Sequence, residues 1–318
     1  MIVFRLPDET VLYTTDHCFS HCSVRFFSFD LKAKASFSGL ITPLSPKDFM
    51  ETKWTTENVY SDTLKETKTE YLNRVLETKN YIQKHQLEKL VLARKKIVSA
   101  PQLDIKKTFL NLCKLYPSAF VYLFSYQGDL WIGAFSEILG KYNKKTQIFM
   151  TMSLAGTIGL KEVWSEKEIL EQESVSKYIH HTLEAFSGNI QKSAPYDHLS
   201  GNIKHLCTDF SVHLSLPEIP SLIQKLHPTP AVCGFPKDIS LKGLHTLENF
   251  DREYYAGYSQ IDTPDYLYYF VNLRCAKIYK NSLVLYLGGG ITPLSNPEKE
   301  WQETERKANG LLGSLVFS

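Results

Sequence analysis

Two pairs of glutamates share one spacing in widely separated parts of the chain. Glu168 and Glu171 lie three residues apart, and Glu300 and Glu303 repeat that interval, with Lys307 four residues after Glu303. In a helix, residues three or four apart project from the same face. The simpler interpretation is solvated charge, in which Glu168 caps its helix and Glu303 forms an ordinary surface ion pair with Lys307.

The alternative is that the two acidic faces meet in one cleft. Four neighbouring carboxylates would repel one another strongly unless a divalent cation lay between them. Ligation by carboxylate oxygens, with water completing an octahedron, suits Mg²⁺ better than zinc. The spacing alone leaves both interpretations open.

The first glutamate pair lies in a predicted helix. Ser165 and Glu168 form a capping-box pattern, and Gly188 stands just beyond Phe186, where such a helix would end. These signals predict a helix over residues 165–186, with both glutamates near its beginning.

The second pair follows another helix start, because Asn296 is a good N-cap and Pro297 suits the first helical position. This helix is predicted to run through Lys307 towards Gly310. Apolar runs elsewhere predict strands at 90–94, 119–124, 130–132, 266–272 and 282–287. Segments 191–202 and 237–249 are expected to be connections that carry shorter elements. The mixture predicts a single α/β (α+β) domain over residues 1–318, without a repeat or a linker.

Three glycines, Gly288 to Gly290, follow the last predicted strand. They could form a tight turn, or they could let the backbone approach an anion closely. The run is not followed by the Gly-Lys-Ser/Thr of a phosphate loop, and it lacks the spacing of a dinucleotide fingerprint.

The overall composition excludes several classes of protein. Of 318 residues, 43% are apolar and 22% are charged, which is typical of a globular chain. The net charge of +2 is spread along the sequence, so no nucleic-acid partner is expected. The basic run 94–96 is interpreted as a solvated strand end. No apolar stretch is long enough for a membrane helix, and acidic residues near the amino terminus do not fit a signal peptide. The six scattered cysteines are expected to be reduced thiols. Together these features favour a cytoplasmic protein.

Five sequence blocks resemble the chorismate-binding enzymes, which include isochorismate synthases, salicylate synthases and the large subunits of anthranilate and aminodeoxychorismate synthases. The blocks occur in the family's order over about three quarters of the chain. They are Glu88-Lys-Leu-Val-Leu-Ala-Arg94, Leu154-Ala-Gly-Thr157, Leu226-His-Pro-Thr-Pro-Ala-Val-Cys-Gly-Phe-Pro236, Phe250-Asp-Arg-Glu-Tyr-Tyr-Ala-Gly257, and Arg274-Cys-Ala-Lys277 leading through Gly288-Gly-Gly-Ile291 to Pro297-Glu-Lys-Glu-Trp-Gln-Glu-Thr304.

The resemblance implies one domain with two β-sheets packed face to face, helices outside, and an active site deep between the sheets. Residues 1–79 would form a shortened N-terminal part of the sheets, and residues 80–312 would carry the motifs. Glu171 and Glu303 would bind Mg²⁺ directly, and Glu168 and Glu300 would hold its waters. The residues implied to bind chorismate are Gly156, Thr157, His205, Ala231, Tyr255, Arg274, Gly288 and Lys307.

The same resemblance implies the chemistry. Lys89 would activate water for attack at ring carbon 2, and as a base it must be neutral, which requires burial. Glu137 would protonate the hydroxyl that leaves carbon 4, so its pKa should be raised. This chain has Phe135 and Ser136 before that glutamate where relatives usually have serine and proline, and Gln172 where many have histidine.

Single positions distinguish the sister activities. Anthranilate synthases carry glutamine at the position of Lys89, so no amidotransferase subunit is expected here. Aminodeoxychorismate synthases place a nucleophilic lysine where this chain has Ala155, and enzymes that eliminate pyruvate have threonine at the position of Ala231. The resemblance therefore implies an isochorismate synthase, an isomerase of menaquinone or siderophore biosynthesis and a monomer or weak dimer. The alternatives are a salicylate synthase and a non-catalytic chorismate-binding protein.

Overall fold

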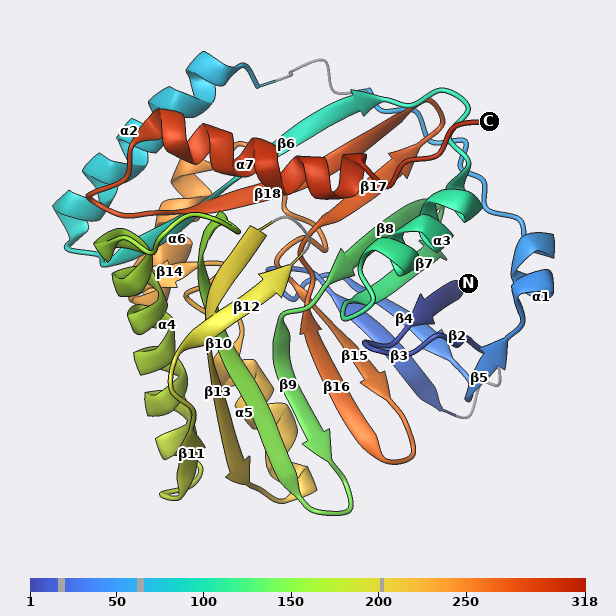
Figure 1. The fold of residues 1–318 in the computed structure, drawn as a ribbon, viewed down its shortest axis with the longest axis horizontal. Helices are drawn as coiled ribbons and strands as arrows, with labels where there is room; N and C mark the ends of the chain where they lie inside the picture. The colour runs from blue at the N-terminus through green and yellow to red at the C-terminus, as the bar shows by residue number, and fades with distance from the viewer. Residues whose placement is uncertain (17–20, 62–65, 201–202) are drawn as a thin grey trace.

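The computed structural model describes residues 1–16, 21–61, 66–200 and 203–318. Two large antiparallel sheets, with helices packed around them, organise this part of the chain (Figure 1). The prediction of a mixed α/β fold is confirmed.

Sheet A has the strand order β14-β6-β18-β17-β8-β7-β1-β2-β5. Its strands are β1 (Ile2–Arg5), β2 (Leu12–Thr15), β5 (Ile41–Leu44), β6 (Lys89–Ser99), β7 (Phe120–Tyr126), β8 (Asp129–Phe135), β14 (Gly234–Phe235), β17 (Cys275–Tyr279) and β18 (Ser282–Ile291). Sheet B has the order β11-β13-β10-β9-β16-β15-β3-β4, and β12 also pairs with β13. Its strands are β3 (Cys22–Phe27), β4 (Lys34–Ser38), β9 (Ile138–Asn143), β10 (Ile148–Gly159), β11 (Ile190–Lys192), β12 (Tyr196–Ser200), β13 (Ile203–His213), β15 (Tyr258–Asp262) and β16 (Tyr266–Val271).

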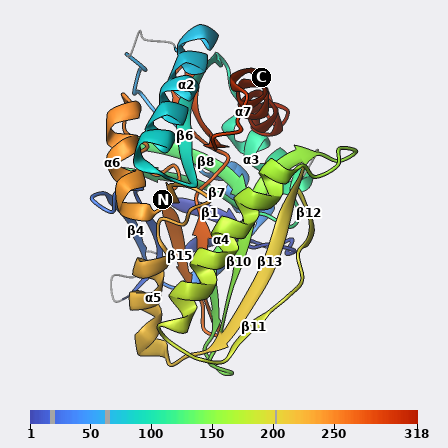
Figure 2. The same cartoon turned by 90° about the vertical axis from the view of Figure 1, so that its left-hand side faces the viewer.

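The helices lie on the outer sides of the sheets. They are α1 (Pro46–Glu51), α2 (Lys68–His85), α3 (Ile105–Leu115), α4 (Glu166–Glu184), α5 (Ile219–Leu226), α6 (Lys237–Leu247) and α7 (Pro297–Leu312), with a short 3₁₀ turn at Leu216–Glu218. Helices α2 and α7 pack against β6 and β18 of sheet A, whereas α4 lies along β10 and β13 of sheet B (Figure 2). Within the described residues, no helix is both long and apolar enough to cross a membrane.

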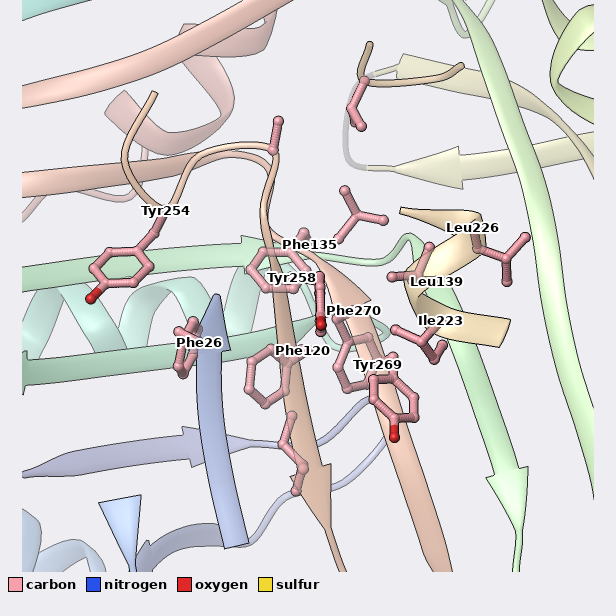
Figure 3. Close-up of a cluster of buried hydrophobic side chains, with 14 of the residues drawn as sticks. Phe26, Phe120, Phe135, Leu139, Ile223, Leu226, Tyr254, Tyr258, Tyr269 and Phe270 are labelled. Atoms are coloured by element: carbon pink, nitrogen blue, oxygen red, sulfur yellow. The ribbon is translucent and has the colours of Figure 1, made fainter. Parts of the chain in front are cut away.

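The main core lies between the two sheets and is rich in aromatic rings (Figure 3). Phe120 of sheet A stacks on Phe270 of sheet B with ring centroids 4.7 Å apart and an interplanar angle of 6°. Phe26 of sheet B packs against Tyr122 of sheet A at 4.7 Å. Burial of these apolar side chains is the dominant stabilising contribution in such a fold, and it holds the two sheets face to face.

Two of the points at which the chain passes between the sheets are neighbours. It leaves β8 of sheet A at Phe135 and enters β9 of sheet B at Ile138, and it returns from β16 to β17 between Val271 and Cys275. These crossovers lie side by side, because the Ala134 amide donates to the Arg274 carbonyl (3.3 Å) and the Val271 amide donates to the Glu137 carbonyl (3.1 Å). The residues at the crossovers therefore stand at the junction of the sheets.

The predicted elements are present with shifted ends. The predicted helices correspond to α4 and α7, and the connections at 191–202 and 237–249 carry β11, β12 and α6. The three glycines do not form a turn. Gly288, Gly289 and Gly290 continue β18 and pair with Ala93, Leu92 and Val91 of β6.

The interpretation of residues 94–96 as a solvated strand end was wrong at Arg94. Its side chain is 2% exposed, lies over the Trp301 ring with 4.0 Å to the centroid, and pairs with Glu305. Helix α7 covers this end of β6, so the guanidinium exchanges water for an aromatic face and a carboxylate.

The five described cysteines are free thiols, as expected. Cys18, the sixth, lies outside the described residues.

Candidate active site

One pocket gathers residues that lie far apart in the sequence. Its lining includes every residue that the sequence predicts to bind substrate, namely Gly156, Thr157, His205, Ala231, Tyr255, Arg274, Gly288 and Lys307. Glu137 and Glu171 line it as well. The contributing segments are the two crossovers, the ends of β10 and β13, the glycine run of β18, and helices α4 and α7.

Glu137 occupies the crossover from β8 to β9 and is 6% exposed. Glu137 lies between β8 and β9 and belongs to neither strand. Its side chain therefore does not follow the alternation that directs strand residues to one face of a sheet. Burial raises the pKa of Glu137 to about 7, against the smaller opposing effects of the positive charges of Lys89 and Lys307. The group is therefore a carboxylic acid that holds its proton up to near-neutral pH.

A bulge in β10 shapes the neighbouring wall. The register of β10 against β13 shifts between Ala155 and Ile158, and Gly156 has a φ of 71°, a conformation that favours glycine. The Gly156 carbonyl and the Thr157 hydroxyl both face His205 Nδ1, at 3.0 and 3.1 Å. The bulge thus fixes the imidazole ring of His205.

The environment of His205 keeps its ring neutral. Removal from bulk water, together with the nearby charges of Arg274 and Lys307, lowers the pKa of His205 to about 3. An Arg274 guanidinium nitrogen lies 3.2 Å from Nε2. Since arginine only donates, Nε2 accepts this bond, and Nδ1 then carries the proton and donates to Gly156.

Arg274 lies at the second crossover with a φ of 44°. This left-handed conformation is unusual for a residue other than glycine, and the side chain faces the pocket from the end of the crossover. Burial lowers the pKa of Arg274 from its ordinary value, although the guanidinium remains charged at any physiological pH. Together with Lys307, it makes the pocket positive towards an anionic ligand.

Lys307 projects from α7 into the same pocket. Its ammonium donates to the Gly288 carbonyl at 2.9 Å and to Glu303 Oε1 at 2.8 Å. Glu303 and Lys307 are therefore an ion pair inside the site, whereas the simpler interpretation had placed them on the surface.

Lys89 is the first residue of β6 and is 1% exposed. Its Nζ lies 2.7 Å from Glu171 Oε1 of α4, but none of the described residues offers this ammonium a well-aligned hydrogen bond. Gly290 makes this approach possible, because a Cβ there would lie 2.2 Å from Glu171 Oε1 and 2.7 Å from Lys89 Cε. Lys89 therefore stands behind Glu171 and lines an adjoining pocket, which shares Glu171 with the first.

A second pocket adjoins the first between the amino-terminal halves of α4 and α7. We call it the α4–α7 opening, and its lining residues include Lys167, Glu168, Glu300, Glu303 and Arg306. The half-buried Glu168 accepts hydrogen bonds from the Ser165 backbone and hydroxyl, which completes the capping box of α4. In this structure Glu168 thus forms the cap that the simpler interpretation assigned to it.

Glu300 and Glu303 lie close together on α7. Burial and then the charge of Glu303 raise the pKa of Glu300. Burial also acts to raise the pKa of Glu303, but Lys307 and Lys167 outweigh it and lower that pKa. Glu300 Oε1 pairs with Lys167 at 2.9 Å, and its buried Oε2 has no hydrogen-bond partner among the described residues.

These side chains suit a hard divalent cation. Three carboxylates converge on the glycine run, since a Cβ at Gly289 would lie 3.4 Å from Glu300 Oε2 and 3.9 Å from Glu303 Oε1, beside Glu171 at Gly290. All the donors are oxygens, and one of them is buried and unpartnered. In the part of the chain that the structure describes, no group of three or more acidic, histidine or cysteine side chains is arranged so that it could hold a metal ion.

The sequence analysis missed Lys167, which pairs with Glu300. A signal for it was present, because Lys167 precedes Glu171 by four residues and so lies on the same face of α4.

Comparison with known proteins places these motifs in a family. The profile of a family described as "Chorismate binding enzyme" matches residues 3–316. Isochorismate synthase MenF of Bacillus subtilis is 27% identical over 264 residues, which cover 78% of this chain and 56% of that protein. Isochorismate synthase EntC of Escherichia coli is 32% identical over 200 residues, which cover 58% and 51%. The chain thus spans about half the length of these curated relatives.

Solved structures show the same fold. The menaquinone-specific isochorismate synthase MenF of Escherichia coli superposes with a TM-score of 0.80 at 20% identity, over 98% of this chain and 88% of that one. Anthranilate synthase component I of Streptococcus pneumoniae gives a TM-score of 0.67 at 20% identity, over 84% and 62%. Proteins named for different activities therefore share this architecture, and the family profile, which spans nearly the whole sequence, shows that this chain belongs to the chorismate-binding enzymes.

Proposed function

We propose that this chain is a magnesium-dependent isochorismate synthase, which converts chorismate to isochorismate. The observation that carries the proposal is the relation of two groups to one pocket: Glu137, with its pKa raised to about 7, lines it, and Lys89 is buried on the far side of Glu171, which also lines it. An acid that retains its proton near neutrality and a buried amine are the two partners that displacement of a hydroxyl by water requires.

Chorismate is a dianion, and the pocket offers it positive charge. Arg274 is suited to a planar carboxylate, because its guanidinium can donate two parallel hydrogen bonds, and His205 orients it. Lys307 provides a second cation near Gly288. When bound by Glu171 and Glu303, with Glu168 and Glu300 holding its waters, Mg²⁺ would supply a Lewis acid and a template for the ring carboxylate.

Lys89 and Glu137 each carry out one of the two proton transfers. Lys89, in its neutral amine form, accepts a proton from a water molecule as the water oxygen bonds to carbon 2 of the ring. The ring double bonds shift, the bond from carbon 4 to its hydroxyl breaks, and Glu137 donates a proton to the departing oxygen. One water enters and one leaves, so the product is an isomer of the substrate.

The side chain at position 231 supports a reaction that stops at this stage. Ala231 lines the pocket with a methyl group and has no hydroxyl to offer the enolpyruvyl group. Retention of the pyruvyl group is therefore expected. Lys89 in place of glutamine supports water rather than ammonia as the nucleophile, so no amidotransferase partner is proposed.

Product analysis tests the proposal. The purified chain is incubated with chorismate and Mg²⁺, and the products are separated by liquid chromatography while pyruvate is followed by a coupled lactate dehydrogenase assay. Isochorismate without pyruvate is expected. Salicylate with an equal amount of pyruvate would instead identify a salicylate synthase, and chorismate binding without turnover would identify a non-catalytic binding protein.

A further inference from the structure

Each of the three carboxylates that converge on the glycine run is paired with a different lysine. Glu171 pairs with Lys89 and Glu303 pairs with Lys307, as described above. Glu300 pairs with Lys167, whose Nζ lies 2.9 Å from Oε1. Three ammonium groups therefore neutralise an acidic cluster that would otherwise be strongly repulsive.

Lys167 differs from the other two lysines in its position. Lys89 is 1% exposed, and Lys307 is held by the Gly288 carbonyl in addition to Glu303. The Lys167 side chain is 17% exposed, stands in the first turn of α4, and reaches across the α4–α7 opening to Glu300 on α7. Its flexible stem can therefore turn outwards without disturbing a strand.

The charges around Lys167 are those expected around a bound cation. Burial alone would lower the pKa of this lysine, but Glu303, Glu171 and Glu300 together raise it well above its ordinary value. The same three glutamates act on one ammonium, which is in direct contact with Glu300.

Glu300 is only half satisfied by this arrangement. Its side chain is 2% exposed, Oε1 takes the Lys167 ammonium, and Oε2 has no hydrogen-bond partner within the described chain. A buried carboxylate oxygen in this position can accept a further partner, and a cation on this side would supply one.

We infer that Lys167 is an exchangeable counter-ion of the acidic cluster, which neutralises Glu300 while no divalent cation is bound and swings into the α4–α7 opening when Mg²⁺ takes its place. The inference rests on the magnesium site of the proposed function. Lys167 is then a positioning residue that keeps α4 and α7 together before metal binding, and it competes with the metal for Glu300.

Chemical labelling of the unmodified protein tests the exchange. Lysine acylation by an N-hydroxysuccinimide ester is measured by peptide mass spectrometry with and without saturating MgCl₂. Labelling of Lys167 is expected to rise several-fold with Mg²⁺, whereas the exposed Lys299 of the same opening serves as the control and should not change. Unchanged or reduced labelling of Lys167 would overturn the inference.

A variant provides a second readout that does not depend on turnover. K167M is expected to lower the melting temperature of the metal-free protein, to bind Mg²⁺ several-fold more tightly by calorimetry, and to match wild type in stability at saturating Mg²⁺. K299M removes an equal charge from the opening and should change the Mg²⁺ affinity less. Weaker Mg²⁺ binding by K167M, or a smaller effect than that of K299M, would contradict competition for Glu300.

Calorimetry and labelling distinguish failure of the magnesium site from failure of the lysine exchange. If calorimetry detects no Mg²⁺ binding to wild type, the magnesium site of the proposed function is wrong. If Mg²⁺ binds and Lys167 stays protected, the site stands and only the exchange is wrong.

Discussion

Lys89 Nζ lies 2.7 Å from Glu171 Oε1, although the two residues belong to different layers of the fold. Lys89 begins β6 of sheet A, whereas Glu171 lies in α4, which covers sheet B. The ion pair therefore joins the two halves of the molecule beside the pocket that Glu171 lines. In the proposed mechanism, one partner handles the proton of the attacking water and the other binds the metal.

Replacing Lys89 by methionine is expected to reduce kcat by roughly 10²- to 10⁴-fold, the usual contribution of a general base. The side chain keeps nearly the same length, so chorismate binding measured by calorimetry should change little. K96M is the matched control, since Lys96 lies on the same strand but pairs with Glu305 away from the pocket. Turnover by K89M comparable to that of K96M would remove Lys89 from the mechanism.

Glu137 should give the enzyme a pH limit on its alkaline side. Its folded pKa is raised from 4.5 to about 7, so the acid form is lost as the pH rises through that value. For wild type, kcat/KM is therefore expected to fall above about pH 7, approaching tenfold per pH unit. E137Q should lose roughly 10²- to 10⁴-fold in kcat and should show no such decline between pH 6 and 9. A decline that persists in E137Q would assign the titration to another group.

How much of this site could be predicted from the sequence depends on how local each signal is. The capping box of Ser165 and Glu168 and the Asn296-Pro297 start are short-range, and α4 and α7 begin where these signals indicate. The meeting of Glu171 with Glu300 and Glu303 depends instead on how the two helices pack on different sheets. No residue pattern within either helix contains that information, so the spacing left the meeting as one of two interpretations and only the family resemblance favoured it.

Other features also came from tertiary structure. Arg94 looks like a solvated residue within a basic run, and only the packing of α7 over β6 buries it against Trp301. Gly288 to Gly290 carry a strong turn signal, yet the hydrogen-bonded ladder with β6 overrides it. The position of Glu137 at a crossover between sheets requires the pairing order of all the strands.

Arg274 should contribute mainly to binding. Lysine at this position keeps the charge but loses the two-pronged donor geometry and the contact with His205 Nε2, which is 3.2 Å in wild type. R274K is therefore expected to raise the KM for chorismate by roughly 10- to 100-fold, which corresponds to one charged hydrogen bond. R306K, in which the exposed ion pair with Glu162 is altered, should leave the KM for chorismate within about threefold of the wild-type value. Equal KM values for the two variants would contradict the binding role.

Gly290 is expected to be intolerant of even one added methyl group. The Cβ of G290A would lie 2.2 Å from Glu171 Oε1, so both partners of the Lys89–Glu171 pair must move. A loss of about 1–3 kcal/mol in the free energy of unfolding is expected, together with weaker Mg²⁺ binding. G188A serves as the control, because a Cβ at Gly188 meets nothing within 4 Å and should change stability by no more than about 0.5 kcal/mol. Chemical denaturation measures both variants, and an unaltered G290A would show that the glycine run does not hold the carboxylates closely.

The most direct test of the central claim is the origin of the new hydroxyl oxygen. A single turnover of chorismate in H₂¹⁸O with Mg²⁺ is quenched, and the product is analysed by mass spectrometry and ¹³C NMR. Water attack at carbon 2 with loss of the carbon 4 hydroxyl predicts isochorismate that carries one ¹⁸O, located on carbon 2. Isochorismate without the label, or a labelled hydroxyl still on carbon 4, would contradict the account.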